Sequence, residues 1–275
     1  MENKIKLGTS GNPPNFFKSK FGKDRINAVD WIASIGLNAY ELLMTYGART
    51  KPEVAKLIGD KAKNLGVSLS VHAPYYVVLS SSKEEVFENS VKELVKTLGL
   101  AEIMGAEKVV FHPGFKNHEK AMENCIRGIK EVKKKYKGNV KLLPETMGLK
   151  SQLGSLQEVL QICIQTNTEP CIDFAHVHAR EGGVLRDKES IKQVLLEIKK
   201  KLGEDALKRL HCHFYPVEYT EKGEKKHRAY NEKGFYPSSK DFVLVIKELD
   251  LQPTIISESR DSQDLAALEI KQLLN

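Results

Sequence analysis

The feature that most constrains the fold of this 275-residue chain is an alternation, repeated eight times, of a short apolar run and a longer segment of helical character. The apolar runs are nearly continuous in Val, Ile and Leu, which is typical of parallel strands that are buried on both faces. Their ranges are 5–10, 39–44, 68–74, 108–114, 140–146, 170–177, 209–214 and 254–259. Eight such units account for residues 1–275 and predict a single-domain (β/α)₈ TIM barrel in the α/β class.

The segments between the apolar runs have the periodicity of amphipathic helices. Val91, Leu94 and Leu98, for example, lie at i, i+3 and i+7 and place one apolar stripe on a helix. Two connections are longer than a simple loop, and both follow expected strands, at 179–187 and 215–236. Long loops after barrel strands usually build a functional site, so we expect one on that face.

Composition narrows the choice of compartment and partner. The net charge of +7 and the pI of about 9.0 are compatible with a polyanionic partner, although solvated helices explain the Lys-rich runs 133–135 and 199–201 equally well. The four cysteines are scattered without a CxxC pair, which indicates reduced thiols and a cytoplasmic protein. Apolar runs fall short of the ~20 residues of a membrane span, so we expect no membrane association and a stable monomer.

Residues of the kind that bind metal ions stand at the ends of six successive expected strands. These residues, with one more His from the long loop after the seventh strand, are His72, His112, Glu145, Asp173, His176, His213, Glu258 and His227. Of the eight histidines only His118 lies outside these strand ends and that loop. A parallel barrel directs the C-terminal ends of all its strands to one face, so these side chains should converge.

Imidazole and carboxylate together favour Zn²⁺, with Mn²⁺ or Fe²⁺ as alternatives, over the all-oxygen sites of Mg²⁺ and Ca²⁺. Each residue alone has an ordinary structural explanation: a strand-end His is often only hydrogen-bonded, and a buried carboxylate is often ion-paired. Six strand ends in succession are not explained in this way, because buried carboxylates are rare unless they are paired or bound to metal. The pattern therefore predicts a metal centre at the barrel mouth.

The same motifs resemble those of the endonuclease IV family, the family-2 apurinic/apyrimidinic endonucleases of the xylose-isomerase-like barrel superfamily. The resemblance covers nearly the whole chain. The matching segments are His-Ala-Pro-Tyr at 72–75, His-Pro-Gly at 112–114, Glu-Thr-Met-Gly at 145–148, Asp-Phe-Ala-His at 173–176, His213 and Ser-Glu-Ser at 257–259. No single one of these motifs is specific, but the ensemble is.

The resemblance implies a cluster of two or three zinc ions and assigns ligands to each. The first ion would take His72, His112 and Glu145, the second Glu145, Asp173, His213 and Glu258, and the third His176 and His227. Glu145, shared by two metals, and Glu258 are then the expected catalytic carboxylates, which position the attacking water.

The chain departs from the family at the third ion, where an Asp is expected two residues before His227. Lys225 occupies that position. A cation cannot ligate zinc, so either Glu224 or a water substitutes, or the site is weak or empty. In the second case Lys225 would lie near the scissile phosphate and contact DNA.

The seventh strand also departs from the family pattern. An expected Asn-Asp pair after its His is replaced by Phe-Tyr-Pro at 214–216. His213 is the preferred ligand, but His211 projects to the same side of the strand, so sequence leaves His211 open.

The activity implied by the resemblance is that of a hydrolase in base excision repair. It would cut double-stranded DNA 5′ to an abasic site and leave a 3′-hydroxyl. Tyr75 matches a residue that inserts into the duplex at the gap, and Arg49 is a candidate second contact. For both, capping of the barrel or plain solvent exposure is the alternative.

Two other functions remain open. A sugar isomerase or epimerase on the same barrel would use one metal and few extra histidines. A non-catalytic DNA- or metal-binding barrel would fit the substitution at Lys225.

Overall fold

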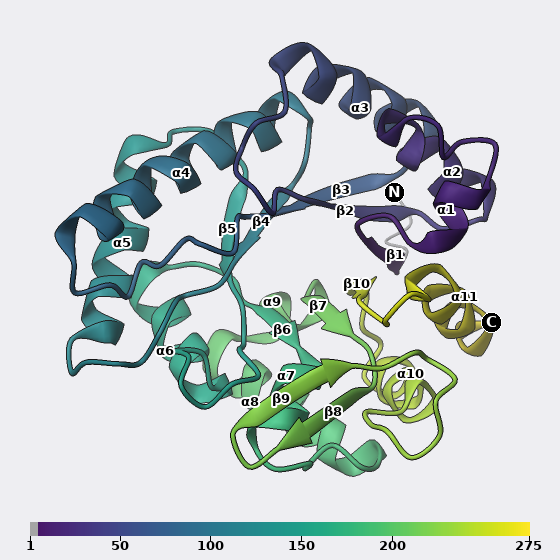
Figure 1. The fold of residues 1–275 in the computed structure, drawn as a ribbon. Helices are drawn as coiled ribbons and strands as arrows, with labels where there is room; N and C mark the ends of the chain where they lie inside the picture. Colours follow the sequence, from purple (N-terminus) through teal and green to yellow (C-terminus); the bar gives the residue numbers. More distant parts are fainter. Residues whose placement is uncertain (1–4) are drawn as a thin grey trace.

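Eight parallel strands form the centre of the computed structural model, which describes residues 5–275 (Figure 1). The strands are β1 (Lys6–Ser10), β2 (Ala39–Leu43), β3 (Ser68–His72), β4 (Lys108–Phe111), β5 (Lys141–Pro144), β6 (Cys171–Asp173), β7 (His211–Phe214) and β10 (Thr254–Ser257). Their order is β5-β4-β3-β2-β1-β10-β7-β6. A parallel bridge between Glu145 and Cys171 joins the two ends of this sheet, so the predicted (β/α)₈ barrel is confirmed.

Helices surround the barrel (Figure 1). They are α1 (Pro14–Lys18), η1 (Arg25–Asn27), α2 (Ala28–Ser34), α3 (Pro52–Leu65), α4 (Glu84–Ile103), α5 (Ala121–Lys135), α6 (Leu156–Thr166), α7 (Phe174–Arg180), α8 (Lys188–Leu202), α9 (Glu204–Lys208), α10 (Ser239–Glu248) and α11 (Gln263–Leu274). No helix in the described part of the chain is both long enough and apolar enough to cross a membrane.

Local sequence explains where several helices begin and which face they bury. Val91, Leu94 and Leu98 of α4 are buried as their spacing predicts. The Ser155 side chain accepts the Glu158 backbone N–H, and the Glu158 side chain accepts the Ser155 N–H. This capping box satisfies two N–H groups that the first turn of α6 would leave unpaired.

The sixth apolar run ends differently from the prediction. The range 170–177 was expected to be strand, but β6 stops at Asp173 and α7 starts at Phe174. The Asp173 side chain accepts the backbone N–H of His176 and so caps this helix. His176 therefore lies in the first turn of a helix, and its correct position follows from a cap and not from strand alternation.

The long connection after β7 contains a second, two-stranded antiparallel sheet, which the sequence did not predict. Its strands are β8 (Val217–Thr220) and β9 (Gly223–His227). The hairpin packs on α7. It carries His227 back to the barrel mouth, next to the residues that end the strands.

Candidate metal centre

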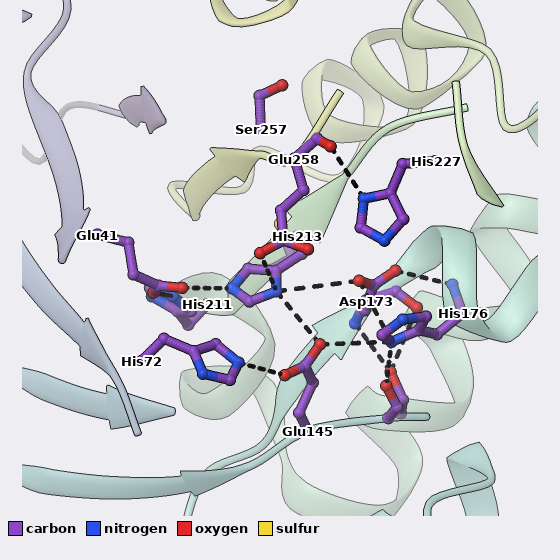
Figure 2. A network of polar contacts seen from close by, with 12 residues as sticks. Glu41, His72, Glu145, Asp173, His176, His211, His213, His227, Ser257 and Glu258 are labelled. Atoms are coloured by element: carbon purple, nitrogen blue, oxygen red, sulfur yellow. Dashed lines mark hydrogen bonds and ion pairs between the residues drawn. The ribbon is translucent and has the colours of Figure 1, made fainter. Parts of the chain in front are cut away.

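The eight predicted ligands lie together at the C-terminal mouth of the barrel. His72 ends β3, Asp173 ends β6 and His213 lies on β7. His112, Glu145 and Glu258 follow the last residues of β4, β5 and β10, while α7 and β9 supply His176 and His227. Ligand-type atoms of these residues fall into overlapping groups within 4.8 Å of one another. Figure 2 shows this network of polar contacts.

Glu145 connects the groups. Its Oε2 lies 3.0 Å from His72 Nε2 and 3.2 Å from His112 Nε2. Its Oε1 lies 3.3 Å from both His213 Nδ1 and His176 Nδ1. The two oxygens of one buried carboxylate thus face two separate sets of imidazoles. With His72 and His112 on one side and His213 on the other, the carboxylate is placed where it would be shared between two metal ions.

The middle group consists of Glu145, Asp173, His213 and Glu258, and it gives the strongest evidence for a metal ion. His213 Nδ1 lies 3.7 Å from Glu258 Oε1 and 3.9 Å from Asp173 Oδ2. Both His213 Nδ1 and Asp173 Oδ2 are buried and lack a hydrogen-bonding partner among residues 5–275. Zinc bonded to N and O ligands at about 2.0–2.1 Å holds them roughly 3.3 Å apart, close to these separations. A divalent ion would satisfy both atoms, so these residues fit a divalent metal ion.

The third group contains Glu224 in place of the missing Asp. Glu224 Oε2 lies 2.9 Å from His176 Nε2, and its Oε1 lies 2.9 Å from His227 Nε2. Lys225 turns the other way, is exposed, and pairs with Glu218 at 2.6 Å. Of the two sequence interpretations, the geometry fits the one in which Glu224 is the ligand, and Lys225 does not enter the cluster.

The second ring nitrogen of each of three histidines fixes the direction of the first. His72 Nδ1 donates to the backbone carbonyl of Ala73 at 2.9 Å. His176 Nδ1 donates to the backbone carbonyl of Thr146 at 2.7 Å, and His227 Nδ1 to the backbone carbonyl of Glu258 at 3.0 Å. A neutral imidazole that donates from Nδ1 presents a lone pair on Nε2. These backbone acceptors therefore aim three Nε2 atoms at the carboxylates, as ligand histidines require.

Sequence left the choice between His211 and His213 open, and the contacts inside the barrel favour His213. His213 Nδ1 faces Glu145, Asp173 and Glu258. His211 instead bonds Glu41 through Nε2 at 2.9 Å. Burial lowers the pKa of His211 to about 4 even with Glu41 beside it. Sequence analysis missed Glu41, because it lies on β2 with no ligand motif around it.

Without a metal ion, protons balance the negative charge of the carboxylates in this site. Burial alone would lower the pKa of His72, but the hydrogen bond and charge of Glu145 outweigh burial and raise that pKa to about 9. The pKa of His227 rises to about 9 against burial because of Glu224 and Glu258. Burial raises the pKa of Asp173 to about 7, although His176 opposes the shift. These groups thus hold protons that a bound metal ion would displace.

A family model described as a xylose isomerase-like TIM barrel matches residues 29–274. The chain belongs to this family. An uncharacterized protein of Methanocaldococcus jannaschii is 34% identical over 259 residues, which cover 92% of this chain and 91% of that protein. A probable endonuclease 4 of Aquifex aeolicus is 30% identical over 162 residues, which cover 56% of this chain and 57% of the relative. The chain thus spans little more than half of the latter.

Solved structures agree on the fold. Endonuclease IV from Thermus thermophilus superposes with a TM-score of 0.73 at 20% identity and 98% coverage of both chains. A D-psicose 3-epimerase superposes with a TM-score of 0.68 at 13% identity, covering 98% of this chain and 99% of the epimerase. At these identities the likeness shows the xylose isomerase-like barrel alone, shared by nucleases and epimerases.

The close packing of the third group, His176, Glu224 and His227, requires a glycine at position 148. A Cβ at position 148 would lie 2.7 Å from Glu224 Cβ and 2.7 Å from His176 Cδ2, closer than carbon atoms approach. We expect Gly148→Ala to push these two side chains apart and to weaken the third metal by roughly tenfold or more, in the range of supporting-residue effects. Metal content per chain measures this. Lys225→Ala, beside Glu224 on β9, is the control and should leave metal content unchanged. Equal losses in both variants would contradict the assignment of Glu224 as a ligand.

The raised pKa values predict the pH dependence of the metal-free protein. A His whose pKa is raised from 6.5 to about 9 contributes stability that is present below pH 6.5 and lost as pH rises through about 9, and Asp173, raised to about 7, acts in the same direction. We expect Tm of the metal-free protein to fall by roughly 3 °C or more from pH 6.5 to pH 9, since one pKa unit is worth about 1.4 kcal/mol. Zinc should remove most of this fall, because it replaces the protons. A Tm that is flat or rises over this range would refute the assignment.

Proposed function

We propose that this protein is a zinc-dependent apurinic/apyrimidinic endonuclease of base excision repair. It hydrolyses the phosphodiester 5′ to an abasic site in double-stranded DNA and leaves a 3′-hydroxyl. The observation that carries the proposal is the placement of Glu145 between two sets of imidazoles, with a third set built on Glu224. Relatives named endonuclease 4 support the same reaction class.

The residues of the mouth have distinct parts in this reaction. Metal ions held there would act as Lewis acids toward a phosphodiester and lower the pKa of a water molecule. Glu145 is buried and shared, so it sets the spacing of the groups, whereas the Glu258 side chain is 16% exposed and reaches toward the opening. Glu258 is therefore placed to orient a water molecule beside the phosphate.

Aromatic side chains on one side of the mouth suit the proposed substrate. Tyr46, Tyr75, Tyr76 and Phe115 come from the loops after β2, β3 and β4, and all four are exposed. Arg49 is exposed on the first of these loops. Exposed rings stack on bases and fill the gap left by a missing base, and an abasic nucleotide is easily extruded because it does not stack. Sequence analysis singled out only Tyr75 of the four rings.

Tyr75 is expected to read the gap. Its side chain is 61% exposed, so Tyr75→Ala should leave the fold intact. Loss of stacking is worth about 1–3 kcal/mol, so affinity for abasic duplex should fall by roughly 10- to 100-fold, with a much smaller loss on intact duplex. Titration of the metal-loaded protein with the two duplexes measures both affinities. Equal losses on the two duplexes would assign Tyr75 to general support of the mouth.

The test of function is a nicking assay with metal-loaded protein on a duplex that contains one abasic site. Extension of the product by a DNA polymerase reports the 3′-hydroxyl. Elemental analysis is carried out on the same preparation, because a sugar isomerase or epimerase of this family would hold one metal per chain. At most one metal and no nick would reject the endonuclease and favour the isomerase; two or more metals without a nick would favour a non-catalytic barrel.

A further inference from the structure

Glu41 is a carboxylate buried completely inside the barrel, below the predicted ligands. Its Oε2 accepts a hydrogen bond from Ser70 Oγ at 2.8 Å and contacts His211 Nε2 at 2.9 Å. Its Oε1 lies 2.9 Å from His213 Nε2 (Figure 2). Neither Oε1 nor this Nε2 has another hydrogen-bonding partner among the described residues.

Burying this charge is costly and calls for a reason. An ionised carboxylate removed from water costs several kcal/mol unless it is paired. Within residues 5–275 no Lys or Arg forms an ion pair with Glu41, and the basic side chains that contact it there are those of His211 and His213. The carboxylate is thus stabilised by the very imidazole that faces the metal ligands.

The two nitrogens of His213 point in opposite directions. Nδ1 faces Glu145, Asp173 and Glu258, while Nε2 faces Glu41. A neutral imidazole carries one N–H and one lone pair, so a proton held on Nε2 by Glu41 leaves the Nδ1 lone pair toward the three carboxylates. The other ligand histidines with a fixed second nitrogen use a backbone carbonyl for this purpose. His213 uses a full negative charge, which makes its free nitrogen more basic.

We propose that Glu41 is a positioning residue: it holds the proton on His213 Nε2 and thereby sets the affinity of the middle metal site. This rests on the metal centre of the proposed function. Glu41 acts through His213 and does not itself touch the metal, because its Oε1 lies on the Nε2 side of the ring while the three carboxylates lie on the Nδ1 side. Ser70 and His211 hold the carboxylate from its other oxygen.

The test compares Glu41→Gln with Ser70→Ala in the full-length protein. Glu41→Gln keeps the shape and removes the charge; Ser70→Ala removes a hydrogen bond to Glu41 but leaves Glu41 facing His213. Zinc binding is measured by competition with a chelator. We expect Glu41→Gln to weaken one zinc ion by about 10- to 100-fold while the remaining zinc binds as in wild type, and Ser70→Ala to change zinc affinity by less than about threefold.

Thermal unfolding of the metal-free proteins separates positioning from a packing role. If Glu41 positions His213, the Glu41→Gln variant loses zinc affinity even when the Tm of the metal-free protein is unchanged. A lowered metal-free Tm with unchanged zinc affinity in the folded protein overturns the proposal and assigns Glu41 to packing. So does a zinc-loaded structure in which a Glu41 oxygen is bonded to zinc at about 2 Å.

A measurement on the wild type covers the case in which Glu41→Gln does not fold. Nitrogen NMR of zinc-loaded protein with ¹⁵N-labelled histidine reports which ring nitrogen carries the proton. We expect His213 to carry it on Nε2 and to bind zinc through Nδ1, the reverse of His72 and His227; a proton on His213 Nδ1 overturns the proposal. The nicking assay is independent of this result. Wild-type protein that binds zinc but does not cut abasic DNA rejects the proposed function and leaves the role of Glu41 standing. A Glu41→Gln variant that binds zinc as tightly as the wild type rejects the role of Glu41 and leaves the proposed function standing.

Discussion

Glu145→Gln is expected to reduce cleavage of abasic DNA by at least about a thousandfold, at the upper end of what loss of one transition-state contact costs. Gln has the same shape but no charge, and only one of its two terminal atoms accepts a hydrogen bond. Four imidazoles face the two oxygens of Glu145 at 3.0–3.3 Å, so in the variant one set faces an NH₂ group and both sets lose the negative charge. Single-turnover cleavage and metal content per chain measure the effect, and at least one metal should be lost.

The matched control is Glu169→Gln, on the N-terminal side of the barrel. Glu169 is ion-paired with Lys141, the first residue of β5. It has the same charge as Glu145 and precedes a neighbouring strand, but it lies at the opposite end of the barrel. This variant should cleave and bind metal as the wild type does. Retention of both cleavage and full metal content in Glu145→Gln would refute the shared carboxylate.

Removal of metal by a chelator is expected to abolish cleavage and to lower Tm. A ligand present at about a thousand times its Kd stabilises the folded state by roughly 4 kcal/mol, so each lost ion should lower Tm by about 10 °C. The metal-free site retains protons on its histidines, which replace part of the lost charge, so the protein should stay folded near neutral pH.

Adding back one metal at a time completes this experiment. Zinc, manganese and ferrous iron are supplied separately to the metal-free protein, and the cleavage rate and Tm are measured for each. Restoration by zinc identifies the ion proposed here. Cleavage that survives complete metal removal would contradict the metal-dependent mechanism for this site.

How far sequence reaches is clearest for the ligands that end strands. His72 and Asp173 are the last residues of β3 and β6, and a parallel barrel brings all such ends to one mouth. Knowing the residue types and the repeat was therefore enough to predict their convergence. The same holds for the stripe on α4, because helical spacing alone puts Val91 and Leu94 on the buried side.

Other parts of the site were decided only by tertiary structure. Glu224 was one of two alternatives, and the turn of the β8–β9 hairpin brings it between His176 and His227 while Lys225 points to solvent. Neighbouring residues on a strand point to opposite sides, so the register of one hairpin settled which of the two faces the metal ligands. No local pattern specifies that register.

Sequence by itself determined the barrel, its eight strands and the mouth at which the ligands meet, because the repeat of apolar and helical periods is written locally along the chain. Only the tertiary structure distinguished His213 from His211 and revealed Glu41. All three project into the barrel interior, and what separates them is depth and the neighbour across the barrel, as in the contact of Glu41 with His211 170 positions away. Such contacts depend on how the sheet closes, and a pattern of nearby residues carries no information about them.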